Sequence, residues 1–265
     1  MAFHIPQFDL EAFVGATLAE DLGPTGRDVT SESVIPADVR FDGVMDSRDA
    51  ITVAGLPIAV AFFQTLDPVM DIQILVDEGQ QVPVGTDLMR LKGNARAMLT
   101  AERSALNTVQ HLSGIATMTR LYVDAISGTG CILLDTRKTI PGLRLLEKYA
   151  TRMGGATNHR MGLWDAAMIK DNHVAVAGGV AEAVSRAKMP AWNGSSLRLI
   201  ASPRSSLALP QGQAICCSTI WMPIRCARLW RSWLAACRPR RLAGLRWIPS
   251  ARKLKPGLLT YPLVA

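Results

Sequence analysis

The sequence contains no aspartate or glutamate after Glu182. Up to that residue the chain has 22 acidic and 15 basic residues, a net charge of −7, whereas from Ala183 onward it has 14 basic residues, a net charge of +14. At ordinary usage a segment of this length holds about ten acidic residues. The overall charge of +7 therefore joins two different compositions and does not by itself indicate a nucleic-acid or membrane partner.

Other signals are also missing. The five cysteines have no metal-ligand spacing and do not suggest a disulfide framework. The first residues turn polar at Gln7 and Asp9, so they lack the basic and apolar regions of a signal peptide. No apolar stretch is long enough to span a bilayer. These absences predict a soluble cytoplasmic protein, and 265 residues that are 49% hydrophobic can bury a sizeable core.

The first hundred residues have mixed helical and strand patterns. Asp9 is positioned to cap a helix that ends at Gly23 and Pro24, and residues 56–65 have the composition of a short buried helix. We expect a strand pair within residues 40–54, with a turn near residues 47–49. Further strands are expected at residues 72–76 and 88–91.

A long helical pattern follows from residue 95 to about residue 113. Arg103, Asn107 and His111 are four residues apart in it and therefore share one face. Such a face is usually solvated or capped. After further helical residues, Cys131 to Leu134 form a short apolar run that predicts a strand, and residues 145–153 predict the next helix.

Positive charge begins where that strand ends. The segment Asp135-Thr-Arg-Lys-Thr-Ile-Pro-Gly-Leu-Arg144 contains Arg137 and Lys138. Active sites of α/β barrels and sheets lie at the carboxyl ends of strands. The arginine fork suits a carboxylate or phosphate, whereas lysine is a compact point charge, so the adjacent pair suggests two anionic groups. Taken alone, the segment could equally be a solvated loop.

A second cationic cluster makes the solvated-loop interpretation weaker. Asn158-His159-Arg160 follows a glycine-rich turn, and Lys170 directly follows a predicted strand at residues 166–169. A lone histidine is more often a satisfied core residue, but His159 beside Arg160 is well placed to donate hydrogen bonds to an anion. The two clusters together predict a cationic site for an anionic substrate.

The motifs together resemble the quinolinate phosphoribosyltransferase family. The resemblance covers about residues 8–188 and extends less sharply to the segments before residue 117. The motifs that carry it are Asp135-Thr-Arg-Lys-Thr with Pro-Gly-Leu-Arg144, Asn158-His-Arg-Met-Gly-Leu-Trp-Asp165, Ile169-Lys-Asp-Asn-His173, and more weakly Glu20 to Gly23, Glu102 to Asn107 and His111 to Ala116.

This resemblance implies a fold and an activity. The implied fold is α/β, with an N-terminal α/β sandwich domain at residues 1–115, then a TIM-like α/β barrel of fewer than eight strands that begins at residues 116–188. The implied reaction transfers the phosphoribosyl group of phosphoribosyl pyrophosphate to quinolinate with decarboxylation, giving nicotinate mononucleotide in NAD synthesis with Mg²⁺. Preorganised cations stabilise the charge that develops, so no covalent nucleophile is needed.

The resemblance also implies residue roles. Arg137, His159 and Arg160 would hold the carboxylates of quinolinate, and Arg103 would reach the site from the partner subunit of a homodimer. Lys138 and Lys170 would contact the phosphoribosyl substrate and are the candidate catalytic residues. No metal ligand is identifiable, because the two acidic contacts that the family has after the segment at Lys188 have no counterpart here.

The tail at residues 189–265 therefore departs from the family, and we interpret it as the product of a frameshift near Lys188 to Trp192. Read with the last base of each codon and the first two of the next, Cys216-Cys217 must give Leu and Trp221-Met222 must give Asp. With permitted codons, Ala214 to Met222 then gives His-Leu-Leu-Leu-Asp-Asn-Met-Asp. The same frame allows Glu-Ala-Ser-Gly after Arg240, as the family expects.

Two other interpretations of the tail remain. It could be a natural basic tail, or a nucleic-acid-binding extension that uses Arg225 to Arg246 with Trp221, Trp230, Trp233 and Trp247. Two other functions also remain: a paralogue that uses another anionic acceptor, and a non-catalytic binding protein. The Asn158-His-Arg160 and Ile169 to His173 motifs favour quinolinate over the acceptor of a paralogue.

The coding DNA tests the frameshift hypothesis. Sequencing of an independent isolate across codons 188–192 should reveal a base inserted or deleted relative to the present frame, after which the downstream codons should read Leu-Leu-Asp-Asn-Met and Glu-Ala-Ser-Gly. An intact frame with verified bases would remove the hypothesis.

Overall fold

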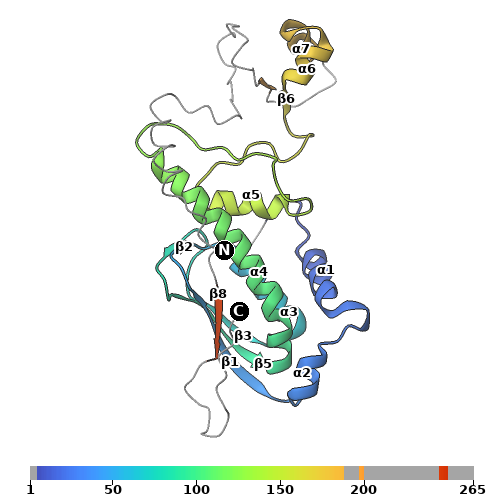
Figure 1. Ribbon diagram of the computed structural model, residues 1–265, viewed down its shortest axis with the longest axis vertical. Coiled ribbons are helices and arrows are strands. Elements are labelled where there is room, and N and C mark those ends of the chain that lie inside the picture. The colour runs from blue at the N-terminus through green and yellow to red at the C-terminus, as the bar shows by residue number, and fades with distance from the viewer. Residues whose placement is uncertain (1–4, 188–196, 200–244, 250–265) are drawn as a thin grey trace. The chain divides into compact units, whose positions relative to one another are not determined.

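A computed structural model describes residues 5–187, 197–199 and 245–249 (Figure 1). These residues belong to two compact units. The first unit contains residues 5–133, 145–157 and 245–249, and the second contains residues 134–144, 158–187 and 197–199. No helix in the described ranges is long and apolar enough to cross a membrane.

The first unit mixes helices with short strands. Its helical elements are α1 (Leu10–Leu22), the 3-10 turn η1 (Gly23–Thr25), α2 (Val29–Val34), α3 (Leu56–Leu66), α4 (Ala95–Ala125) and α5 (Arg144–Met153). Its strands are β1 (Arg40–Ser47), β2 (Ile51–Thr52), β3 (Asp71–Ile74), β4 (Gln81–Val82), β5 (Asp87–Asn94) and β8 (Leu245–Pro249). Asp9 caps α1 by accepting from the backbone N–H of Ala12, which confirms the predicted start of the first helix.

A four-stranded antiparallel sheet in the order β3-β5-β1-β8 supports this unit. Arg40 lies opposite Asn94 at one end of the β1–β5 pair, and the register shifts between Met45 and Asp46 near the other. Residues of β5 alternate between buried and exposed positions, as expected for a strand with one face toward a core.

The predicted strand pair within residues 40–54 is wrong in its pairing. β1 and β2 occupy the expected positions, but β1 pairs with β5 and β8, whereas β2 pairs with β4. A strand has only two edges, and both edges of β1 are already hydrogen-bonded. The turn after Ser47 therefore carries the chain into a second sheet.

The core of the first unit lies between α3 and α4, which run side by side next to the sheet (Figure 1). Phe62 and Phe63 of α3 are completely buried, and burial of each ring contributes about 1.5–3 kcal/mol. Gly55 caps α3 with φ +102°, and a Cβ there would lie 3.0 Å from Cδ1 of Leu112. Only glycine combines this backbone conformation with so close an approach to α4.

The second unit contains β6 (Ala167–Ile169), α6 (Asp171–Ala177), α7 (Val180–Ala187) and β7 (Leu197–Leu199). β6 pairs with β7 in parallel, and Ile169 packs with Ala183 in a small apolar cluster. A parallel pair connected through helices is the arrangement of α/β folds. The predicted mixed α/β class is thereby confirmed.

Two further predictions need correction or restriction. Residues 131–134 form only an isolated bridge at Leu134, because the described residues give this segment no continuous strand neighbour. Most of the tail at 189–265 lies outside the described residues, but β7 and β8 belong to it and pair by their backbones. The predicted domain boundary at residues 115 and 116 falls inside the continuous helix α4, and the domain division stays a prediction.

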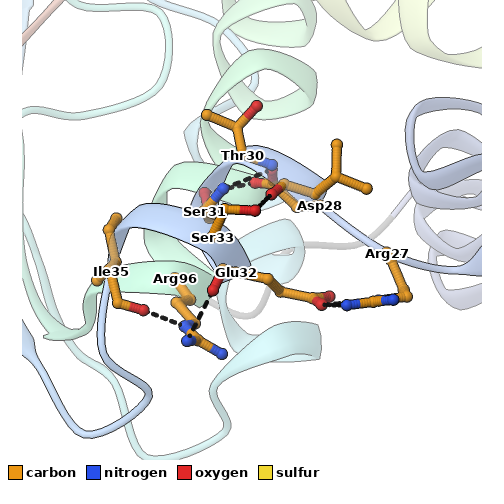
Figure 2. Close-up of polar contacts among 9 residues, drawn as sticks. Arg27, Asp28, Thr30, Ser31, Glu32, Ser33, Ile35 and Arg96 are labelled. Atoms are coloured by element: carbon orange, nitrogen blue, oxygen red, sulfur yellow. Dashed lines mark hydrogen bonds and ion pairs between the residues drawn. The ribbon is translucent and has the colours of Figure 1, made fainter.

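The short helix α2 is attached to the rest of the first unit by polar contacts at both ends. Figure 2 shows the contacts of Asp28 with Thr30 and Ser31 and those of Arg96 with Glu32 and Ile35. Asp28 caps α2 and accepts from the backbone N–H groups of Thr30 and Ser31, the Ser31 hydroxyl at 2.6 Å and the Thr100 hydroxyl at 3.0 Å. At the other end, Arg96 of α4 donates to the carbonyls of Glu32 and Ile35. These contacts dock α2 on α4.

The Asp28 cap predicts a pH-dependent stability. The Ser31 hydroxyl lowers the pKa of Asp28 most, and the backbone and Thr100 donors add to this. Because the folded pKa lies below the unfolded value of about 3.9, the stabilisation is complete above that pH and is lost as the pH falls through the folded pKa. Asp28→Ala should cost about 1 kcal/mol in denaturant unfolding at pH 7, and less as the pH approaches 3.

The exposed Asp71 of β3 offers a matched control, since Asp71→Ala should change the free energy of unfolding by less than about 0.5 kcal/mol. An Asp28→Ala deficit that stays constant down to pH 2 would contradict the role of the ionised carboxylate.

Candidate anion-binding site

The two predicted cationic segments, residues 135–144 and residues 158–173, both lie in the second unit. Both oxygens of the Asp135 carboxylate accept hydrogen bonds from the second segment. The side-chain amide of Asn158 donates to Oδ2 at 2.7 Å, and the backbone N–H of His159 donates to Oδ1 at 2.7 Å. Asp135 therefore joins two segments that are 23 residues apart in the chain.

Arg160 is held at the interior of this unit. The residue is only 9% exposed, and its Nη1 donates to the carbonyl of Ala166 at 3.0 Å. Burial lowers the pKa of Arg160 most, the positive charge of Arg137 lowers it further, and Asp165 acts in the opposite direction. Arg137 and Arg160 are thus close enough to repel each other, a state that a bound anion relieves.

Arg137 also has a buried donor without a partner among the described residues. Its Nε is buried and, like the Nε of Arg160, has no hydrogen-bond partner among the residues that the structure describes. Guanidinium N–H groups are strong donors that stay protonated, so two such groups side by side are suited to a carboxylate or phosphate. The structure therefore brings two of the predicted quinolinate ligands together.

The loop that carries Arg137 is shaped by its own polar groups. The backbone N–H of Lys138 donates to the Thr136 hydroxyl at 3.0 Å, and Nε of Arg144 donates to the Thr139 hydroxyl at 3.2 Å. Gly142 has φ +85° in the turn that the Pro141-Gly142 pair predicted. These bonds limit the conformations open to the loop before any ligand binds.

His159 is 7% exposed, with its backbone fixed by Asp135 beside Arg160. Lys138 and Lys170 are exposed in the same unit. Lys170 follows β6, as predicted, and its backbone N–H donates to Nδ1 of His173 at 2.9 Å. His173 therefore has a local structural role, whereas the two lysine side chains extend into solvent, where a charged phosphate can reach them.

A second carboxylate shapes the turn after Arg160. Asp165 accepts from the backbone N–H of Met161 at 2.6 Å and from that of Gly162 at 2.9 Å. A Cβ at Gly162 would lie 2.5 Å from Nε1 of Trp164, so this position excludes larger residues unless the indole moves. The turn places a carboxylate near Arg160.

Helix α5, which follows the 135–144 loop, is anchored in the first unit. Tyr149 donates to Glu78 at 2.5 Å, and Glu78 also accepts from the backbone N–H groups of Gly55 and Leu56 at 2.8 Å each. Burial raises the pKa of Glu78, and burial together with the Glu78 charge raises the pKa of Tyr149. Ordinary sequence patterns gave no signal for this buried pair.

Arg103 lies on α4 in the first unit. It is exposed and shares a helix face with Asn107 and His111, as predicted from the four-residue spacing. Nε2 of His111 lies 3.0 Å from Oε1 of Glu147, so part of this face is capped by α5. Among the six predicted site residues, Arg103 is in the first unit, and the other five are in the second.

Sequence reasoning treated Asp135 and Asp165 only as members of motifs. Their roles as acceptors depend on backbone N–H groups, which leave no trace in a pattern of side chains. One signal was available for Asp135, because it is the first polar residue after an apolar run. Within residues 5–187, no group of three or more His, Cys, Asp or Glu side chains could hold a metal ion. Magnesium therefore stays a proposal.

The sequence of this chain is similar to known proteins of one family. A sequence model described as quinolinate phosphoribosyl transferase, N-terminal domain, matches residues 28–113, and its C-terminal counterpart matches residues 115–195. The probable nicotinate-nucleotide pyrophosphorylase [carboxylating] of Synechocystis sp. is 47% identical over 179 residues, which are 68% of this chain and 60% of that protein. The chloroplastic enzyme of that name from Arabidopsis thaliana is 45% identical over 68% of this chain and 51% of its own.

Solved structures agree with these matches. NadC from Streptococcus pyogenes aligns with a TM-score of 0.71 and 34% identity over 76% of this chain and 70% of its own. The nicotinate-nucleotide pyrophosphorylase from Francisella tularensis aligns with a TM-score of 0.69 and 38% identity over 76% and 71%. The chain nevertheless spans only about half to three fifths of the length of the two curated relatives it matches.

Proposed function

The chain belongs to the quinolinate phosphoribosyltransferase family, and on this premise we propose that it binds quinolinate and phosphoribosyl pyrophosphate and forms nicotinate mononucleotide with release of carbon dioxide and pyrophosphate. The printed names of the relatives, nicotinate-nucleotide pyrophosphorylase [carboxylating], support this reaction. Because the chain spans only part of those relatives, the activity is a proposal for this polypeptide. The cytoplasmic location stays a prediction.

The Arg137–Arg160 pair is the observation that carries the proposal. Quinolinate is a pyridine with two adjacent carboxylates, and this pair offers two guanidinium groups with buried Nε donors that no described residue uses. The repulsion that lowers the pKa of Arg160 is removed when a dianion lies between the two cations. His159, buried beside Arg160, adds a ring that can donate to the same ligand.

The proposed chemistry needs cations more than a nucleophilic side chain. The pyridine nitrogen forms a bond to C1 of the ribose as the bond from that carbon to pyrophosphate breaks. The carboxylate next to the ring nitrogen leaves as carbon dioxide, and a proton replaces it on the ring. Arg137, His159 and Arg160 orient the ring, and Lys138 and Lys170 meet the phosphate groups from the solvent side. Magnesium bound to the pyrophosphate would neutralise that leaving group.

A second candidate function is binding of quinolinate without turnover. The chain has no acidic side chain after Glu182, so the tail supplies no carboxylate to hold magnesium or ribose. The cationic half of the site lies entirely before that point. Binding and turnover can therefore be separated in this protein.

The Arg137→Ala variant tests the proposed site. We expect it to weaken quinolinate binding by about 2–5 kcal/mol, because a charged contact is lost from a desolvated pocket and Arg160 is left to bind the dianion alone. Titration calorimetry of the full-length protein measures the affinity. Formation of nicotinate mononucleotide by the unaltered protein supports the first function, and binding without product supports the second.

Arg90→Ala provides the control for charge, since Arg90 is an exposed arginine of β5 whose pair with Asp87 lies at the surface. It should leave the affinity for quinolinate unchanged. Equal affinity of the Arg137→Ala and unaltered proteins would reject Arg137 as a ligand, and tighter binding of another aromatic acid would favour a paralogous function.

We further propose that the protein acts as a homodimer in which Arg103 contacts the substrate of the partner subunit. The exposure of Arg103 on α4, away from any described ion pair of its own, supports this role. An arginine that serves the other subunit has no effect on the site of its own chain.

Mixing two variants tests this arrangement. Arg103→Ala and Arg137→Ala proteins should each lack high-affinity sites, but random mixing of their subunits should restore about a quarter of the sites of the unaltered protein. This fraction follows because half of the dimers are mixed and each has one complete site. Calorimetric stoichiometry measures it, and no recovery after subunit exchange would refute a contribution from the partner.

A further inference from the structure

The carboxylate of Asp135 joins two segments of the second unit. Its two oxygens each accept a hydrogen bond of 2.7 Å from one dipeptide, Asn158 and His159. Hydrogen bonds to an ionised carboxylate are about twice as strong as neutral ones. Two of them on adjacent donors fix the peptide plane at the start of the segment that carries Arg160.

The position of Asp135 in the chain gives this clamp a consequence for the ligand site. Arg137 is only two residues further along, so one carboxylate determines where the backbone of Arg137 lies relative to that of His159. The clamp therefore supplies geometry to the cluster, whereas the carboxylate that acts on the charge of Arg160 is Asp165.

Two neighbouring contacts among the described residues have different roles. Asp165 accepts from Met161 and Gly162, which are only four and three residues away, so it shapes a local turn. The backbone N–H of Thr157 donates to the carbonyl of Leu133 at 2.9 Å, and this bond does not depend on any side chain. A change at Asp135 therefore removes the clamp and leaves a backbone connection in place.

We propose that Asp135 is a positioning residue of the anion-binding site, which holds His159 and Arg160 in place beside Arg137 without touching the substrate itself. This inference rests on the proposed function, because the bound anion is taken to be quinolinate. A displacement of about 1 Å in such a constellation is enough to reduce its effectiveness on the order of 100-fold.

The donor and acceptor pattern allows a reciprocal test. In Asp135→Asn, the new amide keeps one acceptor oxygen for the His159 N–H, but both hydrogen bonds lose the carboxylate charge, and its NH₂ group faces the NH₂ group of Asn158 in the present orientation of that amide. Adding Asn158→Asp turns the second group into an acceptor, so the hydrogen bond is restored with donor and acceptor exchanged. Asp135→Ala cannot be rescued in this way, because it offers no donor.

Two measurements on the full-length protein distinguish the Asp135 hydrogen bonds from the binding of the ligand. Without ligand, amide hydrogen exchange in a peptide covering residues 158–162 should be about tenfold faster in Asp135→Asn and should return toward the original rate in the Asp135→Asn, Asn158→Asp double variant. Quinolinate affinity, measured by calorimetry, should fall about 10- to 100-fold in the single variant and recover in the double variant. The Asp135→Ala, Asn158→Asp protein should remain defective in both.

Asp71→Asn, an exposed aspartate of β3 changed in the same way, should alter neither readout. Faster exchange with unchanged quinolinate affinity overturns the proposal, as does a double variant that recovers neither property. Absence of quinolinate binding by the unaltered protein overturns the proposed function instead, and the positioning role with it. Failure of the positioning role alone is therefore distinguishable from failure of the proposed function.

Discussion

The site depends on holding two arginines close together in a partly desolvated place. Arg160 is buried and lies near Arg137, and each of these side chains has a buried Nε that no described residue engages. Like charges separate unless the surrounding structure prevents it. Here Asp135 clamps the start of the 158–173 segment, and Asp165 holds the turn that follows Arg160. The anionic ligand that we propose would relieve the repulsion between the two guanidinium groups.

The first unit also contains a carboxylate that joins two elements. Glu78 is partly buried, and it accepts from Tyr149 and from the backbone N–H groups that open α3. A buried carboxylate is costly unless its oxygens are satisfied, and here three donors satisfy them. The same bonds connect α5 to α3, so the helix that leaves the cationic loop has a fixed attachment. Polar contacts thus define positions that apolar packing of Phe62 and Phe63 alone would leave less specific.

The uneven charge of the chain separates two parts of the proposed function, which are binding of the substrate anions and the catalytic contribution of acidic groups. All the predicted ligands for the substrate anions lie before Glu182, and all the residues after it lack carboxylates. Two short segments of the tail nevertheless form strands, β7 beside β6 and β8 beside β1. Strand pairing uses backbone N–H and carbonyl groups, which every residue except proline provides in full, so such pairing does not require the family's side chains. Pairing of this kind adds no acidic group for catalysis.

The sequence by itself determined the cationic segments, the family resemblance, the caps of α1 and the extents of α3 and α5, because these follow from local residue order and helical spacing. It did not determine that β1 and β2 belong to different sheets, or that residues 131–134 form only a bridge, since pairing depends on which strands are available as neighbours. Nor could it identify Asp135 as the clamp on Asn158 and His159. Only tertiary structure decides that, because the backbone N–H of His159 acquires its acceptor when the chain folds back over 24 residues.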